Sequence, residues 1–381
     1  MLYKLDKGVY LLRLSDIINN MQRTKSGNIP KVRLPFSDRF NVSALNGKYD
    51  IRSELGSGGT AKVYYGIRFG DEKPVIIKHI SESIEEKDRL GILRSEANAL
   101  RVKSTSSAKL LDYNHTEGLV VFEYINGVPL IDLIEEQDRN KSLSPQIIYS
   151  LLISLAEACA EIHQSSIVHR DLSAKNIFIS SDLEIKIIDF GMSVDVNTFA
   201  EIAGGTPSVL CPQQINPGQR AEFHFDVYAL AAIGYKLLSG IIPHEDLIDK
   251  TATNSKNNME LIRQRIKNDP TSLVKFSSQI PNSLDQLISD KCLSKEPKSR
   301  PYDALDFKSK LLAICQELDF INPRSITRFW KDECKELIVR LISATKTNES
   351  IHSEATRIAD ATQLDNDRTF MLDNNRTIII S

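Results

Sequence analysis

The chain has 381 residues, of which 41% are hydrophobic and 26% are charged, and its formal net charge is −2. This length exceeds one small domain, and the composition is that of an ordinary globular protein. A charge so close to neutral gives no electrostatic reason to expect nucleic acid as a main partner. No segment approaches 18 uninterrupted apolar residues, so we expect no membrane span.

The N-terminus and the cysteines indicate the compartment. The first residues scatter charges among apolar side chains and lack a small-residue cleavage site, so they do not resemble a secretory signal. The five cysteines are odd in number and widely spaced, which argues against a disulfide framework and a zinc site. We therefore expect a cytoplasmic protein with reduced thiols at Cys159, Cys211, Cys292, Cys315 and Cys334.

Residues 1–47 form a basic extension, with eight Lys or Arg against three Asp, a net charge of 8 − 3 = +5. Its apolar residues could pack as a short strand or helix against the main domain. A solvated leader is an equally good interpretation, because segment boundaries are the weakest predictions from sequence.

The next segment predicts a β-rich lobe over about residues 48–125. Strands are expected at Ile51–Leu55, Ala61–Arg68 and Pro74–Ile80, separated by glycine-bearing turns. Apolar residues at three- and four-residue steps predict a helix over residues 85–103. This lobe would be small and built around one sheet.

From Ser144 onward, helical patterns dominate and predict a larger lobe over about residues 126–320. The clearest helices are expected at Gln146–His163 and Asp226–Ser239. A further helix is predicted at residues 321–344, with its apolar pattern starting at Ser325, and the polar residues 345–381 read as a flexible tail.

A lysine and a glutamate stand out in the predicted small lobe. Lys78 follows the apolar residues Val75, Ile76 and Ile77, where an inward charge is costly unless an anion or a carboxylate meets it. Glu96, on the following helix, supplies such a carboxylate. A surface location for either residue is the alternative.

The most informative run is His169-Arg170-Asp171-Leu172-Ser173-Ala174-Lys175-Asn176, followed by Asp189-Phe190-Gly191. The 18 residues from Asp171 to Asp189 leave room for a short hairpin, so Asp171, Asn176 and Asp189 could converge. A carboxylate that positions a hydroxyl, beside hard oxygen ligands for Mg²⁺, suits phosphoryl transfer. Asx turns or caps are the alternative for each residue alone.

These two segments resemble the catalytic loop and the metal-binding motif of the eukaryotic-like protein kinase family. Further matches follow in the order expected for that family. They are Gly205-Thr206-Pro207, Asp226 at the start of a buried helix, Leu237-Leu238-Ser239-Gly240 with Pro243, and Lys295 to Pro301. Together with the glycine-rich turn that begins at Gly56, the motifs run from Gly56 to Arg300.

The resemblance implies a bilobal α+β fold that binds ATP with Mg²⁺ or Mn²⁺ between a β-rich N-lobe and a helical C-lobe. Lys78 would bind the α and β phosphates, Glu96 would orient Lys78, and Asn176 and Asp189 would hold the metal. The remaining nucleotide-binding residues it implies are Gly56, Ser57, Gly58, Gly59, Val63, Ile76, Glu123, Ile125 and Phe178. Ile76 stands where the family usually has Ala above the adenine ring, so we expect a narrower ATP pocket at that point.

Other departures concern the acceptor. Thr206 occupies the position that marks serine/threonine kinases, whereas Ser173 replaces their lysine and Lys175 stands where tyrosine kinases have arginine. We favour serine/threonine acceptors and expect Lys175 to reach the γ-phosphate. Gln213 replaces the glutamate that normally pairs with Arg300, so the contact keeps a hydrogen bond and loses its ion-pair character.

The resemblance also bears on activation. Arg170 implies a basic pocket that awaits either a phosphorylated residue, Ser193 or Thr198, or a built-in acid, Asp195 or Glu201. Both routes stay open.

Threonines recur in the tail, at Thr356, Thr362, Thr369 and Thr377. Three of them have an acidic or aliphatic residue three positions later, namely Asp365, Leu372 and Ile380. Our hypothesis is that the kinase phosphorylates these sites and so creates docking sites for a forkhead-associated, phosphothreonine-binding partner. The alternative is a tail that packs on the domain or extends a sheet edge.

Two other functions remain as alternatives to a kinase acting on protein substrates. A small-molecule phosphotransferase of the aminoglycoside-kinase type shares the lobes but would not be expected to carry the Gly205-Thr206-Pro207 segment. A pseudokinase scaffold would normally have lost one of Lys78, Asp171, Asn176 or Asp189, and all four are present.

Overall fold

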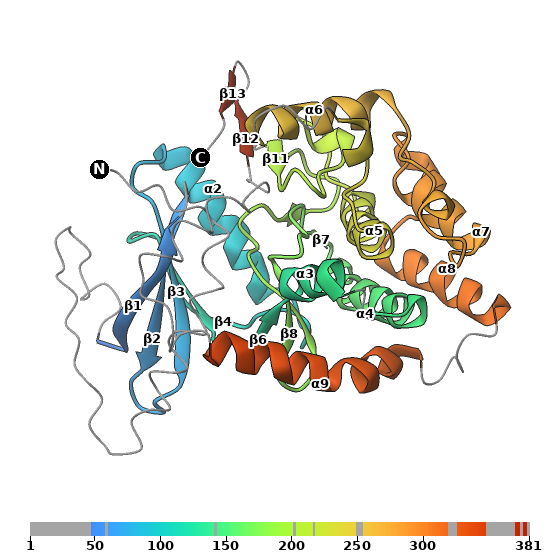
Figure 1. The fold of residues 1–381 in the computed structure, drawn as a ribbon. Coiled ribbons are helices and arrows are strands. Elements are labelled where there is room, and N and C mark those ends of the chain that lie inside the picture. Colours follow the sequence, from blue (N-terminus) through green and yellow to red (C-terminus); the bar gives the residue numbers. More distant parts are fainter. Residues whose placement is uncertain are drawn as a thin grey trace.

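The computed structural model describes residues 47–57, 60–140, 143–200, 203–215, 218–248, 254–318, 326–347, 370–373 and 376–378. A β-rich part is followed by a helical part, which confirms the predicted α+β architecture (Figure 1). The basic extension, Gly58, Gly59, Glu201 and the tail threonines 356, 362 and 369 lie outside the described residues.

The N-terminal part is a five-stranded antiparallel sheet with one helix against it. The strands follow the order β1-β2-β3-β5-β4. Their bounds are β1 Tyr49–Ser57, β2 Ala61–Arg68, β3 Pro74–Ile80, β4 Leu110–Asn114 and β5 Leu119–Glu123. The predicted bounds of the second and third strands are confirmed, and the first strand is longer than predicted.

The helix of this part ends before the predicted residue 103. It comprises α2, Glu86–Ala97, and a single 3₁₀ turn, η3, Asn98–Leu100. Asn98 donates from Nδ2 to the Ser193 carbonyl at 3.3 Å and to its hydroxyl at 3.1 Å. A side-chain amide held by another segment offers one reason for the tighter turn, since such bonds compete with regular helix.

The larger part contains seven α-helices among the described residues, six of them before the C-terminal helix α9, with short strands between them. These six helices are α3 Leu130–Asn140, α4 Pro145–His163, α5 His224–Ser239, α6 Asn254–Lys267, α7 Asn282–Asp285 and α8 Ala304–Glu317. Its strands are β6 Gly127–Pro129, β7 Ile167–Val168, β8 Ile177–Ser180, β9 Ile185–Ile187, β10 Val194–Asp195 and β11 Ala203–Gly205. Short helical turns are η4 Pro212–Ile215, η5 Glu245–Leu247, η6 Leu273–Lys275, the π-helical η7 Gln286–Cys292, and η8 Pro297–Ser299.

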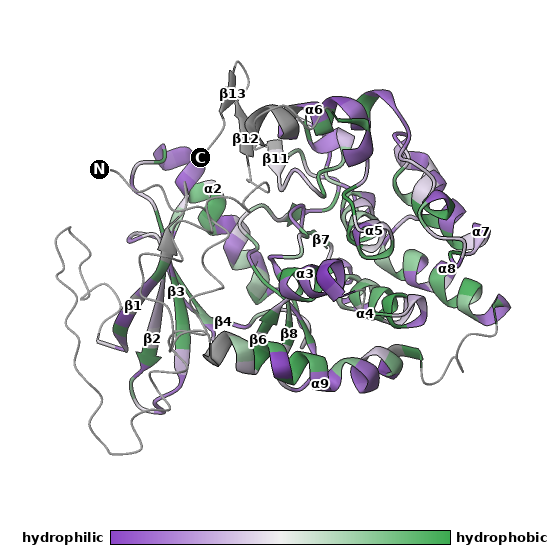
Figure 2. Ribbon diagram, in the orientation of Figure 1, coloured by the Kyte–Doolittle hydropathy of each residue, from purple (hydrophilic) through white to green (hydrophobic). Residues whose placement is uncertain are grey.

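Helix α4 is the centre of this part. Pro145 at its first turn and Ser144, which accepts from the Ile147 amide at 3.4 Å, start the helix. It is long and apolar enough to cross a membrane, but it is largely buried, and α5, α8 and α9 pack around it. Its hydrophobic surface therefore belongs to the protein core, as Figure 2 illustrates for both α4 and α5.

The C-terminal helix α9, Ile326–Thr347, covers one side of α4 (Figure 1). Trp330 is fully buried there and donates from its indole to Ser154 Oγ at 2.9 Å. Its amide donates to Ser150 Oγ at 3.1 Å. Arg340 forms an ion pair with Glu136 of α3 at 2.8 Å. Aromatic burial with satisfied polar atoms fixes this helix to the domain.

Part of the tail differs from the prediction of a flexible segment. Residues 370–373 and 376–378 form two strands, β12 (Phe370–Asp373) and β13 (Arg376–Ile378). They make a three-stranded antiparallel sheet in the order β11-β12-β13. In the β12–β13 pair, Asp373 lies opposite Arg376 and Met371 lies opposite Ile378.

All five cysteines are free and buried, which confirms the expected free thiols.

Candidate active site

The predicted β-strand lysine forms two ion pairs. Lys78 Nζ contacts Glu96 Oε1, and it lies 2.6 Å from Asp189 Oδ1. Glu96 is fully buried on α2, and its other oxygen accepts from the Phe190 amide at 3.1 Å. One glutamate thus joins the sheet, the helix and the Asp189-Phe190-Gly191 segment.

The charges in this group depend on one another. Burial disfavours the charged form of Lys78, but Asp189 and Glu96 outweigh that effect and raise its pKa above the ordinary lysine value. Burial, partly opposed by Lys78, raises the pKa of Glu96 to about 7. The lysine is therefore held positively charged at the end of the sheet.

Asp171 is held on both oxygens. Oδ1 accepts from the Thr206 amide at 2.8 Å and from its hydroxyl at 2.7 Å, and Oδ2 accepts from Asn176 Nδ2 at 3.0 Å. Asn176 Nδ2 also donates to the Asp171 carbonyl at 2.9 Å. The structure thereby brings together three of the residues that the sequence singled out.

The two predicted metal ligands are brought close by the hairpin after the catalytic loop. β8 and β9 pair with Ile177 opposite Ile187, and the Ile188 amide donates to the Asn176 carbonyl at 2.9 Å. Asn176 and Asp189 therefore flank the base of this hairpin. An amide oxygen and a carboxylate form a donor set that fits Mg²⁺.

The predicted catalytic loop, residues 169–176, is held in place by a buried aspartate, Asp226 of α5. Its Oδ2 accepts from the His169 amide at 2.7 Å, and its Oδ1 accepts from the Arg170 amide at 2.8 Å. Arg170 has a φ of 67°, in the left-handed region that side chains rarely adopt. The buried carboxylate offsets the cost of that conformation.

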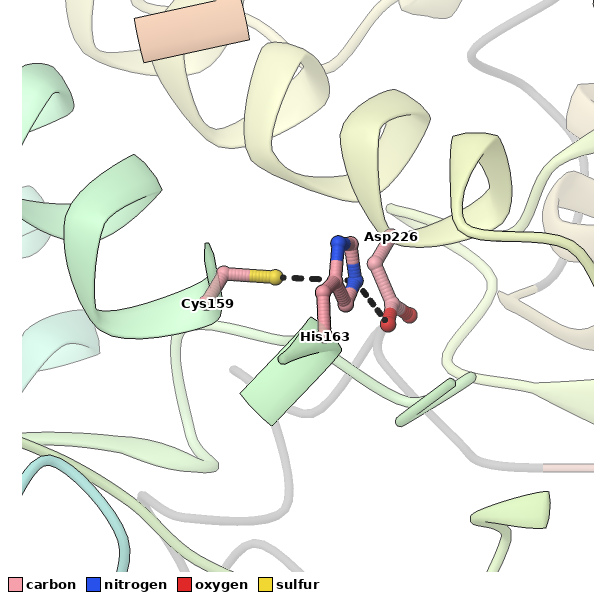
Figure 3. Close-up of side chains that lie close together, drawn as sticks. All are labelled: Cys159, His163 and Asp226. Carbon is pink, nitrogen blue, oxygen red and sulfur yellow. Dashed lines mark hydrogen bonds and ion pairs between the residues drawn. The ribbon is translucent and has the colours of Figure 1, made fainter. Parts of the chain in front are cut away.

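Cys159, His163 and Asp226 cluster behind this loop (Figure 3). His163 Nδ1 accepts from the Ala304 amide at 3.2 Å, which places the proton on Nε2 and directs it to Asp226 at 3.1 Å. Burial raises the pKa of the Cys159 thiol well above its usual value. With Nε2 protonated and both Asp226 oxygens accepting, the cluster serves as a structural anchor instead of a metal site.

Phe190 is fully buried and packs edge-on against His169, with ring centroids 4.9 Å apart. His169 Nε2 lies 3.0 Å from the Ile188 carbonyl. These contacts hold Phe190 inward and leave Asp189 at Lys78.

The comparisons agree with this geometry. The family described as "Protein kinase domain" matches residues 49–311. The chain belongs to the protein kinase domain family.

Three curated relatives of this kinase domain are bacterial. "Serine/threonine-protein kinase pkn3" of Myxococcus xanthus is 26% identical over 306 residues, 75% of this chain and 53% of the relative. "Serine/threonine-protein kinase PknL" of Mycobacterium tuberculosis is 27% identical over 289 residues, covering 74% and 69%. "Serine/threonine-protein kinase PrkC" of Bacillus subtilis is 24% identical over 333 residues, covering 85% and 48%. The chain spans about half the length of pkn3 and PrkC.

In this kinase domain, predicted nucleotide-binding residues share one face of the sheet. Val63 pairs opposite Lys78, and Ile76 pairs opposite Phe122, so these residues project to the same side. Ile76 packs with Leu55 and Val63. Gly56 and Ser57 end β1, and Phe178 is buried on β8. The Glu123 amide donates to the Lys109 carbonyl at 2.9 Å, and Ile125 follows β5.

Within the activation segment, the name used here for residues 192–212, contacts of Ser193 and Asp195 bear on both proposed activation routes. Ser193 is fully buried and donates to the Ser95 carbonyl at 2.9 Å, so it is inaccessible to a kinase in this state. Asp195 pairs with Arg101 at 2.5 Å, while Arg170 Nη1 donates to the Met192 carbonyl at 3.0 Å. The acid at 195 therefore pairs away from Arg170.

Gln213 meets Arg300 as the sequence predicted. Arg300 Nη2 donates to Gln213 Oε1 at 2.7 Å, and Gln213 Nε2 donates to the Lys295 carbonyl at 2.8 Å. Arg300 Nη1 is buried without a hydrogen-bond partner among the described residues. Gln213 thus pairs with Nη2 of the guanidinium.

Sequence reasoning missed Arg265 on α6. Its guanidinium is buried and donates to the carbonyls of Ser208 at 2.5 Å and Leu210 at 2.9 Å, and also to that of Pro207. Three carbonyls of the segment after Thr206 are therefore held by one side chain. An arginine on a polar helix carries no sequence signal for this role, because arginines usually lie on the surface.

Proposed function

We propose that the chain is an ATP-dependent kinase that transfers the γ-phosphoryl group of ATP to serine or threonine of protein substrates. The observation that carries this proposal is Asp171, whose two carboxylate oxygens are held by Thr206 and Asn176. Its support comes from the Lys78–Glu96–Asp189 group and from the family of the chain.

In this proposal the acceptor hydroxyl oxygen forms a bond to the γ-phosphorus, and the bond to the β–γ bridging oxygen of ATP breaks. ADP leaves, and the hydroxyl proton passes to Asp171. Bound Mg²⁺ or Mn²⁺, held by Asn176 and Asp189, would neutralise phosphate charge. Lys78 would contribute a fixed positive charge at the α and β phosphates, and Lys175 would contribute one at the γ-phosphate.

Residues of the tail are candidate acceptors of the same reaction. Thr356, Thr362, Thr369 and Thr377 would be phosphorylated in cis or in trans and bind a phosphothreonine-reading, forkhead-associated partner. Of these, Thr377 lies in β13, whose neighbour β12 pairs with β11 of the activation segment. If a chain truncated at residue 350 bound such a partner as well as the full chain, this docking role would be wrong.

The test is phosphate transfer from radiolabelled ATP by the full chain, compared with Asp171→Asn, followed by mapping of the labelled residues. We expect label on serine or threonine in the wild type and a loss of about 10³-fold or more in the variant. ATP binding without transfer would indicate a pseudokinase. Transfer to small molecules alone would indicate the other phosphotransferase class.

A further inference from the structure

The strand next to the catalytic carboxylate has an unusual partner. β11 pairs antiparallel with β12, with Ala203 opposite Leu372, Gly204 opposite Met371 and Gly205 opposite Phe370. Within the described chain this is the one strand partner of β11. Figure 1 shows the β12–β13 hairpin (Phe370–Asp373 and Arg376–Ile378) against β11, far along the sequence from it.

The paired edge borders the reaction site. A Cβ added to Gly205 would lie 3.7 Å from Asp171 Oδ1 and 3.2 Å from the Arg170 carbonyl. The next residue, Thr206, donates to Asp171. Because paired strands lie about 4.8 Å apart, the backbone of Phe370 runs beside Gly205, the residue before Thr206.

The sequence of β11 suits the approach of a second backbone. Gly204 and Gly205 have φ values of 125° and 144°, and neither has a side chain to obstruct a neighbour. Glycine within a strand often marks a place where another backbone comes close. β11 thus offers an edge for strand addition, the mode by which extended peptides join a sheet.

The hairpin reaches this edge from a fixed origin. Helix α9 is anchored by the buried Trp330, and 22 residues separate Thr347 from Phe370. Docking within one chain is intramolecular, and a tether typically gives an effective concentration of about 1 mM. At that concentration a contact with a Kd of roughly 0.1 mM would be occupied about nine times in ten.

We propose that the edge of β11 is a docking site for an extended peptide, and that the hairpin β12–β13 of the same chain occupies it. In this position the hairpin competes with protein acceptors for the approach to Asp171. The competition rests on the proposed kinase function, whereas the docking does not. The tail is then both a candidate acceptor and a built-in competitor.

The docking is tested with Met371→Pro in the full chain, because proline removes the amide and cannot sit in a paired strand without disruption. The control is Ala359→Pro, a proline in the tail before the hairpin. Amide hydrogen exchange of residues 203–206 should accelerate in Met371→Pro and stay unchanged in Ala359→Pro. A labelled synthetic peptide of residues 368–380 should bind the Met371→Pro chain more strongly than the wild type. Unchanged exchange together with no difference in peptide binding would overturn the docking site.

The competition is tested by steady-state kinetics with casein as acceptor. Met371→Pro should lower the KM for casein by about 3- to 10-fold, with kcat and the KM for ATP unchanged, since an occupied competitor acts on acceptor binding alone. Adding the 368–380 peptide should raise the KM again. An unchanged or raised KM in Met371→Pro would overturn the competitor role. If neither chain transfers phosphate, the proposed function fails, and exchange and peptide binding still decide the docking.

Discussion

Thr206 donates hydrogen bonds from its amide and from its hydroxyl to the same oxygen of Asp171, Oδ1, at 2.8 and 2.7 Å. The activation segment is thereby hydrogen-bonded directly to the proposed catalytic carboxylate. Because the second oxygen accepts from Asn176, the side chain of Asp171 is fixed in one orientation. Movement of the segment that carries Thr206 would release one side of that carboxylate.

The first prediction concerns the hydroxyl of Thr206. Thr206→Ala removes one donor and keeps the amide, so Asp171 is positioned less well and kcat should fall by about 10- to 100-fold with the KM for ATP unchanged. Thr206→Ser keeps the donor and should retain kcat within about threefold. Equal kcat values for the two variants, measured at saturating ATP, would show that the hydroxyl plays no positioning role.

The second prediction concerns Lys175, four residues after Asp171. If it stabilises charge on the γ-phosphate, Lys175→Ala should lower kcat by about 100-fold or more, the usual effect of losing one such donor. Lys298→Ala removes an equal charge from an exposed turn and should leave kcat unchanged. The measurement is phosphate transfer from radiolabelled ATP. Unchanged turnover in Lys175→Ala would contradict a role of Lys175 at the γ-phosphate.

The third prediction concerns Arg265. Arg265→Met would leave three buried carbonyls without their donor, so it should destabilise the protein by about 3 kcal/mol and raise the KM for a protein acceptor more than the KM for ATP. Arg263→Met makes the same change at an exposed position of α6 and should affect neither quantity. Urea unfolding and the two KM values would be measured on both variants. A uniform loss of kcat without a change in acceptor KM would argue against a role of residues 207–210 in acceptor binding.

Some residues of this site could be predicted from the sequence because the pattern that identifies them is local. Lys78, Asp171, Asn176 and Asp189 sit within short motifs whose order and spacing imply the chemistry, so the sequence was enough to propose their roles. The strand bounds of Ala61–Arg68 also followed from local pattern alone. Local patterning suffices where the signal and the structure share the same few residues.

Other features depend on contacts between distant segments. Arg265 is buried only because α6 lies against the carbonyls of residues 207–210, some 55 residues earlier in the chain. The pairing of Gly205 with Phe370 links residues 165 positions apart. No local propensity specifies such partners, since tertiary context decides them.

The fourth prediction tests the neutral contact at Arg300. Gln213→Glu should turn the hydrogen bond from Arg300 Nη2 into a charge-assisted one, at the loss of the bond to the Lys295 carbonyl. We expect a net gain of about 1 kcal/mol in the free energy of unfolding. Gln213→Ala should instead lower it by about 1 kcal/mol, because Arg300 Nη2 loses one of its two acceptors and keeps the Ser294 carbonyl. If Gln213→Glu destabilises as much as Gln213→Ala, the Lys295 contact outweighs the charge.

The fifth prediction concerns pH and Asp132, in the first turn of α3. Burial, with a contribution from Glu135, raises the pKa of Asp132 to about 7 against an opposing effect of Arg139. The unfolded chain, with an aspartate pKa of about 4, loses this proton first, so the contribution of Asp132 to stability is full below about pH 4 and is lost as the pH rises to about 7. Asp132→Asn should therefore be more stable than the wild type at pH 8, by about 1–3 kcal/mol in urea unfolding, and little different at pH 4.5. Glu135→Gln, which removes only the neighbouring charge at an exposed position, should show a smaller gain at pH 8. A difference between Asp132→Asn and the wild type that is the same at both pH values would mean that the carboxyl does not titrate in this window.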